Sequence, residues 1–344
     1  MIARLKYGQK FVLISLLFMI PVLIVLYQWF STQQVEIKRI KSEQTGVSQV
    51  KALMPFMLQV QQHRGLVNGY LNGNLEAGSA IEAKQQEIAS LIEQIDGDFR
   101  KEEMPESYEK WNSVKTAWND ILRSYETLTA PDSFARHSDL VQQVEELIIH
   151  GADETGLTLD SEIQSYYTMK LITQELPALI EGTAVIRGRG NGVLAAGTLT
   201  DDIKLELLLE AAQSDKALIN LMQSLSRIAE LNRSEDGELL QKGEQAAGNI
   251  RNYLGVLDQE IIHKQAMSMN PDAFFAQGTD AIASASEVFQ LAVTLLEQTL
   301  QERISDKESA RNTTILITAA VLLYLLLAAA PLILQYRGLQ RSVG

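Results

Sequence analysis

Two long uncharged apolar segments, one near each end of the chain, most constrain the fold of this sequence. Residues 11–30 (FVLISLLFMIPVLIVLYQWF) and residues 313–336 contain no charged side chain. Each segment has about 20 apolar residues at its core, the length that a helix needs to cross roughly 30 Å of hydrocarbon. A helix also satisfies its own backbone hydrogen bonds in lipid. The sequence therefore predicts a transmembrane helix at 11–30 and another at 313–336, on either side of a middle region at 31–312.

The first segment has features of a retained anchor rather than of a cleaved signal peptide. It is longer than a usual signal-peptide core, and no small-x-small cleavage pattern follows it. Tyr27 and Trp29 lie where aromatic residues collect at a membrane interface. We therefore expect the segment to remain in the mature protein.

Positive charges next to the two segments predict their orientation. Arg4, Lys6 and Lys10 precede the first segment, and Arg337 and Arg341 follow the second. Because short cytoplasmic flanks are rich in Lys and Arg, residues 1–10 and 337–344 are both expected in the cytoplasm. The middle region is then periplasmic, and the expected localisation is the bacterial inner membrane.

The middle region is strongly acidic. It holds all 43 acidic residues of the chain but only 25 of the 30 basic ones. Such a charge balance argues against nucleic acid as a partner. The chain has no cysteine, which is compatible with a periplasmic domain.

Apolar residues recur at three- and four-residue spacing through most of the middle region, and this period is typical of amphipathic helices. The region contains only five prolines and no alternating β-branched runs bounded by hairpin turns. Turn and helix-start signals occur at Met104-Pro105, Ala130-Pro131 and Asn270-Pro271. The predicted fold class is all-α.

An internal repeat is visible at two places. Pro131-Asp132-Ser133-Phe134 corresponds to Pro271-Asp272-Ala273-Phe274, 140 residues later, and the Arg-Gly pair at Arg64 corresponds to that at Arg187, 123 residues later. We expect two extracytoplasmic four-helix bundles built from a duplicated unit, with halves at about 45–155 and 165–305.

Arg64 and Arg187 are the main candidate binding residues. Apolar residues fall at helical spacing on the same face as each arginine, so both side chains are expected inside the bundle or at an interface. A guanidinium in such a place needs a negative partner. That partner is either a carboxylate of the chain, such as Glu175 or Glu181, or a bound planar oxyanion.

His63, Tyr70 and Tyr167 are candidates for the lining of a pocket. Tyrosines in a helical bundle are more often core residues. The four histidines are too far apart in sequence for a His/Cys metal cluster, so no metal site is expected. The chain lacks the nucleophile, phosphate-binding and metalloprotease motifs of common enzymes. We therefore expect no catalytic residue, no cofactor and no enzymatic activity.

Three stretches resemble the helical periplasmic sensor regions of bacterial transmembrane receptors, which include methyl-accepting chemotaxis proteins and sensor kinases. They are Gln61–Leu66 with Gly69-Tyr70-Leu71, Gly156–Asp160 with Ser165–Pro177, and Arg187–Gly190. The arrangement is also similar to nitrate- and nitrite-sensing helical domains. This resemblance implies that Arg64 and Arg187 hold the anion, although His63 departs from the residue expected beside the first arginine.

The resemblance implies a signal-input receptor that acts as a homodimer and transmits a helix shift across the membrane. Such receptors continue after the second span into a HAMP linker and an output domain, whereas eight residues follow Tyr336 here. The expectation is a truncated receptor, or one that works with a separate cytoplasmic signalling protein. The alternative is a membrane-anchored scaffold, in contact with lipid, that binds a periplasmic protein and no small ligand.

Overall fold

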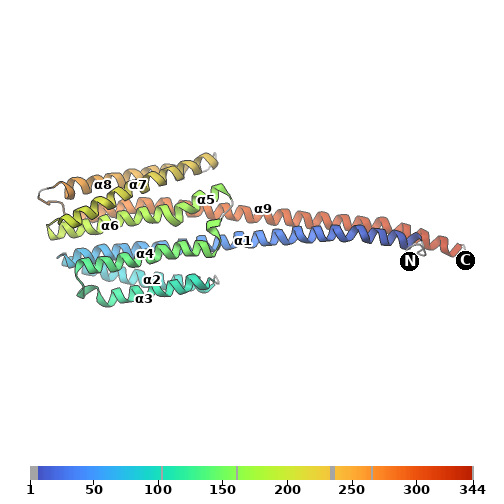
Figure 1. Ribbon diagram of the computed structural model, residues 1–344, viewed down its shortest axis with the longest axis horizontal. Coiled ribbons are helices and arrows are strands. Elements are labelled where there is room, and N and C mark those ends of the chain that lie inside the picture. Colours follow the sequence, from blue (N-terminus) through green and yellow to red (C-terminus); the bar gives the residue numbers. More distant parts are fainter. Residues whose placement is uncertain (1–6, 102–103, 160–161, 233–236, 265, 343–344) are drawn as a thin grey trace. The chain divides into compact units, whose positions relative to one another are not determined.

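The computed structural model describes residues 7–101, 104–159, 162–232, 237–264 and 266–342, and in this part of the chain it contains helices and no strand (Figure 1). The helices are α1 (Tyr7–Leu71), α2 (Gly78–Lys101), α3 (Pro105–Ser124), α4 (Ala130–Glu154), α5 (Ile163–Lys170), α6 (Leu176–Ala196), α7 (Asp201–Asn232), α8 (Gly237–Leu257) and α9 (Pro271–Ser342). Short 3-10 turns lie at Leu75–Ala77, Tyr125–Thr127 and Leu157–Leu159, and π-turns lie at Leu171–Glu175 and Asp258–Ile262. The predicted all-α class is confirmed.

The chain forms two compact units. One comprises Ser42–Thr299, and the other comprises residues 1–41 and 300–344. Within the first unit, α1 lies beside α2, α3 and α4, whereas α6, α7, α8 and the first part of α9 lie together (Figure 1). The first unit is shorter at both ends than the predicted domain at 31–312. In the second unit α1 and α9 are linked by an ion pair of 3.3 Å between Lys41 and Glu308.

Side-chain caps explain why two of the helices start where the sequence indicates. Thr129 Oγ1 accepts a hydrogen bond of 3.2 Å from Asp132 N at the start of α4. Asn270 Oδ1 accepts from Asp272 N at 2.8 Å and from Ala273 N at 3.1 Å at the start of α9. Each cap satisfies backbone donors that a helix N-terminus leaves free. The third predicted start is also correct, since α3 begins at Pro105.

Large aromatic side chains fill the interior of the first four helices. Trp111 and Trp118 of α3 are 0% and 1% exposed. Phe56 of α1 meets the Trp111 ring edge-on, with 5.1 Å between centroids. Burying each such ring contributes on the order of 2 kcal/mol or more. This core holds α1 at the centre of the unit and thereby positions the residues that follow Phe56.

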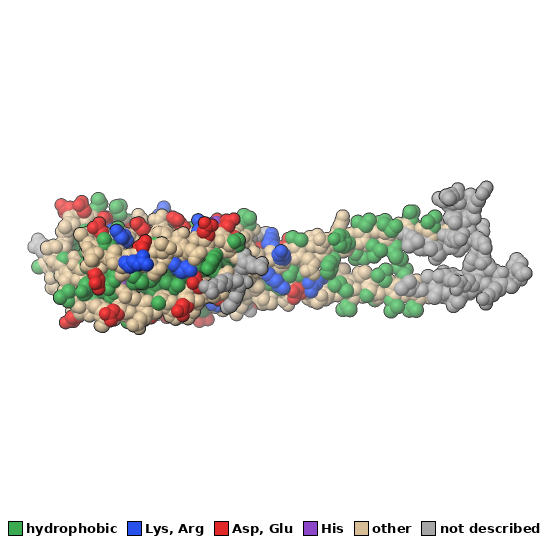
Figure 2. Space-filling model, turned by 90° about the horizontal axis from the view of Figure 1, so that it is seen from below, with side chains coloured by type: hydrophobic (Ala, Val, Ile, Leu, Met, Phe, Trp, Pro, Cys, Tyr) green, Lys and Arg blue, Asp and Glu red, His purple; other side chains and the backbone are tan. Residues whose placement is uncertain are grey.

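The predicted membrane location is wrong. Where the side chains of α1 and α9 are described, neither helix presents a stretch both long and apolar enough to cross a bilayer. Residues 11–12, 14–16, 326 and 328–336 of the two predicted spans have no described side chains, and the remaining runs fall short of the roughly 20 residues that a span needs. Apolar side chains are exposed in the described parts of both helices (Figure 2). Phe18 is 71% exposed and Leu327 is 64% exposed. Residues 1–6 and 343–344 of the predicted cytoplasmic ends lie outside the described residues.

Candidate functional site

Helices α1 and α6 touch at glycines. A Cβ atom built on Gly65 would lie 3.6 Å from the Cα of Gly188, and one built on Gly188 would lie 3.5 Å from the Cα of Gly65. These are ordinary contact distances, but the same Cβ atoms would lie 2.6 Å from Cε2 of Phe275 and 2.8 Å from Cε2 of Phe134, so a larger residue would have to displace these rings. Because each glycine directly follows a candidate arginine, the close contact brings Arg64 and Arg187 into the same region of the unit.

Two asparagines bind the helices to each other across this contact. Asn68 donates from Nδ2 to the carbonyl oxygen of Gly188 at 2.8 Å, and Asn191 donates from Nδ2 to the carbonyl oxygen of Gly65 at 3.4 Å. Each asparagine follows its arginine by four residues and is followed by a further glycine. The shared pattern is Arg-Gly-x-x-Asn-Gly in both helices. The asparagines recur at the same offset of 123 residues as the Arg-Gly pairs, a signal in the sequence that the predicted repeat did not include.

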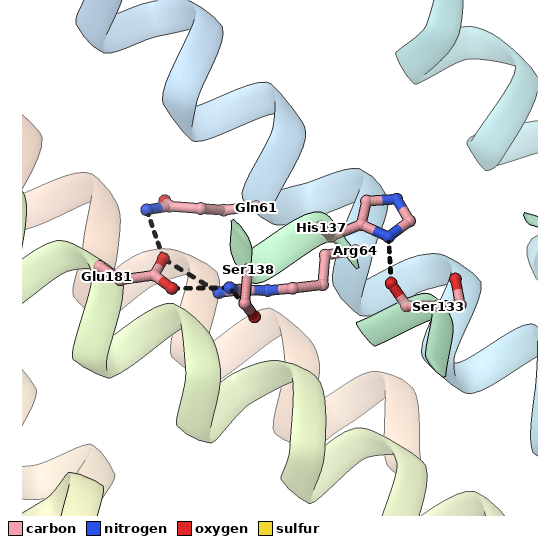
Figure 3. Close-up of polar contacts among 6 residues, drawn as sticks. All are labelled: Gln61, Arg64, Ser133, His137, Ser138 and Glu181. Atoms are coloured by element: carbon pink, nitrogen blue, oxygen red, sulfur yellow. Dashed lines mark hydrogen bonds and ion pairs between the residues drawn. The ribbon is translucent and has the colours of Figure 1, made fainter. Parts of the chain in front are cut away.

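Arg64 is paired with a carboxylate. Its Nη1 donates to Glu181 Oε1 at 2.6 Å and its Nη2 donates to Glu181 Oε2 at 3.0 Å (Figure 3). Gln61 Nε2 donates to Oε2 of the same glutamate at 2.9 Å, and Ser138 Oγ accepts from Arg64 Nη1 at 2.9 Å. The Arg64 guanidinium lies over the Phe134 ring, 4.8 Å from its centroid. A bidentate pair of this kind neutralises the buried arginine.

Arg187 has nearly the same surroundings but no carboxylate. Its guanidinium lies over the Phe275 ring, 4.6 Å from the centroid, and its Nη1 donates to Thr279 Oγ1 at 3.0 Å. Its Nε and Nη2 are buried and have no hydrogen-bond partner among the described residues. Burial lowers the pKa of Arg187 to about 10, because a charged group is disfavoured away from water. The side chain therefore stays charged at neutral pH while two of its donor groups lack an acceptor.

The two arginine environments correspond residue by residue. Ser138 follows Phe134 by four positions, as Thr279 follows Phe275, so the contacts on α4 and α9 are related by an offset of 141 rather than the predicted 140. Glu181 precedes Arg187 by six positions, and the residue six positions before Arg64 is Leu58. Leu58 is therefore the sequence equivalent of Glu181, and it lines the same cavity as Thr279, the hydrogen-bond partner of Arg187.

Tyr253 of α8 adds a second unsatisfied group near Arg187. Its hydroxyl is buried without a hydrogen-bond partner in the described residues. A Cβ on Gly278 would lie 2.6 Å from this hydroxyl and 2.9 Å from Cγ of Arg187. Burial raises the pKa of Tyr253, so the group is a neutral donor. Buried groups that lack partners carry a free-energy cost, which a ligand with acceptor atoms relieves.

His63 lies beside Arg64 in the sequence but belongs to a separate polar cluster. Its Nδ1 is 2.8 Å from Nε2 of His137, and its Nε2 is 3.2 Å from Nε2 of Gln85. His137 Nδ1 is 2.7 Å from the carbonyl oxygen of Ser133. Burial and the neighbouring histidine lower the pKa of His63 to about 2, and burial lowers that of His137 to about 4. Both imidazoles are therefore neutral, and neither is placed to hold an anion.

The two candidate tyrosines lie elsewhere. Tyr70 packs against an apolar cluster formed by Val67, Ala77 and Ile81. Tyr167 lines a separate open cavity with Lys170 and Arg227. Neither residue shares the surroundings of Arg187.

Arg189 lines a cavity of about 610 Å³ between α4, α6 and α7. It is paired with Glu206 at 2.6 Å and stacks on the Phe134 ring at 4.6 Å. A second cavity of about 580 Å³ borders α1, α8 and α9, and its wall includes Leu58 and Thr279. Thr279 is therefore the residue through which Arg187 adjoins a cavity.

Among the described residues, no group of three or more His, Cys, Asp or Glu side chains is arranged to hold a metal ion. Comparison of the chain with protein-family models, with curated proteins and with solved structures finds no match.

Proposed function

We propose that Ser42–Thr299 is the ligand-binding input part of a signalling receptor, and that its ligand is a small planar oxyanion such as nitrate or nitrite. The observation that carries this proposal is the buried guanidinium of Arg187, whose Nε and Nη2 have no partner in the described chain. These two donors form one edge of a planar fork that matches two oxygen atoms of a planar anion. The resemblance to nitrate-sensing helical domains supports the same ligand class.

In this proposal the two arginines have different roles. Arg64 is neutralised by Glu181 and acts as a structural group, whereas Arg187 is the ligand contact. The resemblance assigned both arginines to the anion, whereas this proposal assigns only Arg187 to it. This difference is compatible with a duplicated unit. One copy of the arginine site is neutralised by a carboxylate of the chain, and the other copy keeps two donors that a ligand can use.

Signalling would follow from the position of Arg187 between three helices. Arg187 belongs to α6, its contacts Phe275 and Thr279 belong to α9, and Gly188 touches α1. An anion that draws these groups together would favour one packing of α6 and α9 over another. Receptor helices respond to such differences by shifts of about 1–2 Å. We propose that a homodimer and a downstream signalling protein read this shift.

Leu58→Glu is the most direct test. It would offer Arg187 a carboxylate of the chain, as Glu181 does for Arg64. We expect Leu58→Glu to lower nitrate affinity at least tenfold, since an internal carboxylate would compete for Arg187. Leu58→Gln has nearly the same size without the charge and should retain binding. Isothermal titration calorimetry with sodium nitrate, and with sodium chloride as a salt control, measures both.

Arg187→Met provides a second test that separates binding from folding. Removing an unpaired buried charge should leave the thermal midpoint of the free protein unchanged or higher, yet the nitrate-induced rise should disappear. At one hundred times the dissociation constant that rise corresponds to about 2.7 kcal/mol in the wild type. Equal nitrate responses in wild type and Arg187→Met would contradict the proposal.

A scaffold function is the second candidate, and one surface feature favours it. Leu205, Leu208, Leu209 and Ile219 of α7 are 58%, 43%, 53% and 49% exposed. Exposed apolar side chains at helical spacing are typical of a protein-binding face. The absence of a midpoint shift with nitrate, nitrite, formate or acetate would favour the scaffold over the anion receptor.

A further inference from the structure

Four acidic side chains and one arginine line the cavity between α4, α6 and α7. Asp139 and Glu145 come from α4, Glu181 from α6, and Glu210 from α7. The wall also contains apolar surface, including Val185 and Ala217. Its volume of about 610 Å³ falls in the range of small-molecule sites.

The negative charges of this cavity exceed the positive ones. Glu181 is matched by Arg64, and Arg189 is matched by Glu206. Asp139, Glu145 and Glu210 also line the cavity, and no ion pair involving them is found within the described part of the chain. A positively charged ligand would reduce the mutual repulsion of these carboxylates.

Two buried polar atoms on opposite helices have no partner within the described residues. Ser214 of α7 is 2% exposed, lines the cavity and has a buried Oγ without a hydrogen bond. Glu145 Oε1 on α4 is likewise buried and without a hydrogen-bond partner. Both atoms accept hydrogen bonds, and buried acceptors that lack a donor are costly. A hydrogen-bond donor in the cavity would satisfy both atoms.

Electrostatic effects on the acids agree with this geometry. Burial and the charge of Glu181 raise the pKa of Glu145 to about 7, while Arg64 lowers it and Glu146 raises it. Burial and Glu181 also raise the pKa of Glu210, against the opposite effects of Arg189 and Arg64. In the free protein, nearby positive charges therefore do not fully stabilise the ionised forms of these two carboxyl groups.

We propose that this cavity binds a small organic molecule through a primary ammonium group, with Glu145 and Ser214 accepting its hydrogen bonds and Glu210 adding charge. A primary ammonium has three N–H donors and one positive charge, which match two acceptors and a carboxylate. The apolar part of the ligand would contact Val185 and Ala217. The site is independent of the proposed anion site, since it uses no atom of Arg187.

The test uses the full chain and n-butylammonium chloride as probe, with binding measured by calorimetry at pH 7.5. We expect binding of butylammonium, at least tenfold weaker binding of tetramethylammonium because it lacks N–H donors, and no binding of 1-butanol. Glu145→Gln should weaken butylammonium binding at least tenfold, and Ser214→Ala should weaken it severalfold. Glu146→Gln, one residue away on the exposed side of α4, is the matched control and should bind as the wild type does.

Proton release provides a second measurement. It is expected if Glu145 contacts the ligand, and it is not expected if Glu145 has only a structural role. Binding should force the partly protonated Glu145 to ionise, so that the measured heat depends on the ionisation enthalpy of the buffer. This dependence should vanish in Glu145→Gln. The proposal is overturned if butylammonium does not bind at millimolar concentration, or if it binds equally to wild type and Glu145→Gln. Arg187→Met should leave butylammonium binding intact, so failure of the anion proposal would not affect this result.

Discussion

At the scale of single residues, the buried histidines His63 and His137 are held neutral by one chain of hydrogen bonds. The carbonyl oxygen of Ser133 can only accept, so His137 carries its proton on Nδ1 and presents a bare Nε2. His63 must then donate from Nδ1 and accept on Nε2 from Gln85. Protonation of either ring would place an N–H on Nε2, the atom that accepts a hydrogen bond in this arrangement, and would add a buried charge.

This arrangement predicts a loss of stability in mild acid. The pKa values of both histidines are lowered in the folded protein, so their contribution is complete above about pH 6.5 and is lost as the pH falls and the unfolded chain takes up protons. Glu145, with its raised pKa, contributes in the opposite direction between about pH 4.5 and 7. We expect the free energy of unfolding of Glu145→Gln to fall by roughly 2 to 3 kcal/mol from pH 7 to pH 5.

Urea unfolding at several pH values measures this slope. A flat profile between pH 7 and 5 in Glu145→Gln would show that the histidine pair is not held neutral.

The ion pair between Arg64 and Glu181 predicts strong coupling between two substitutions. Glu181→Leu leaves a buried arginine without its carboxylate and should destabilise the protein by about 3 kcal/mol. Adding Arg64→Met removes the stranded charge, so the double variant should regain most of that loss. A double-mutant cycle in urea measures the coupling. The exposed pair Lys242 and Glu287 is the control and should couple far more weakly, because solvent screens it.

At the scale of helices, the contact between α1 and α6 depends on glycines that helix propensity alone would disfavour. The Arg-Gly-x-x-Asn-Gly pattern places two glycines in each helix, at a cost of about 1 kcal/mol per residue relative to alanine. The close backbone approach and the two asparagine hydrogen bonds offset that cost. Helix starts were predicted from sequence at Met104-Pro105, Ala130-Pro131 and Asn270-Pro271, because such signals involve residues only a few positions apart.

A matched pair of glycine substitutions tests this contact. A Cβ at Gly188 would lie 2.8 Å from Cε2 of Phe134, so Gly188→Ala should destabilise the protein by about 1 to 3 kcal/mol. Gly97 of α2 has nothing within 4 Å of its built Cβ, and Gly97→Ala should stabilise by about 0.5 to 1 kcal/mol. Thermal or urea unfolding gives both values. If the two substitutions changed stability equally, the contact would be looser than described.

At the scale of the whole molecule, the division into two units predicts that the candidate site is self-contained. Every contact of Arg64 and Arg187 described above lies within Ser42–Thr299. A fragment of residues 42–299 should therefore fold cooperatively and bind nitrate with an affinity within threefold of that of the full chain. Circular dichroism and calorimetry measure these properties. A fragment that lacks helical structure would show that residues 1–41 and 300–344 are needed for folding.

The periodicity of apolar residues and the local cap signals were sufficient to predict an all-α chain and the burial of both arginines, because these properties depend on neighbours within one or two helical turns. The repeat was visible for the same reason, since identical residues recur at a fixed offset. The membrane location was inferred from apolar composition and was wrong for the part of the chain that the structure describes.

Only the tertiary structure decided which arginine is neutralised. Sequence left Glu175 and Glu181 as equal partners for either arginine, whereas in the folded chain Glu181 pairs with Arg64, and Glu175 accepts from Ser224 and Lys170. Arg64 and Glu181 lie 117 residues apart, so no local pattern selects this pair. Leu58 is the sequence equivalent of Glu181, but only the folded chain shows that Nε and Nη2 of Arg187 lack a hydrogen-bond partner among the described residues.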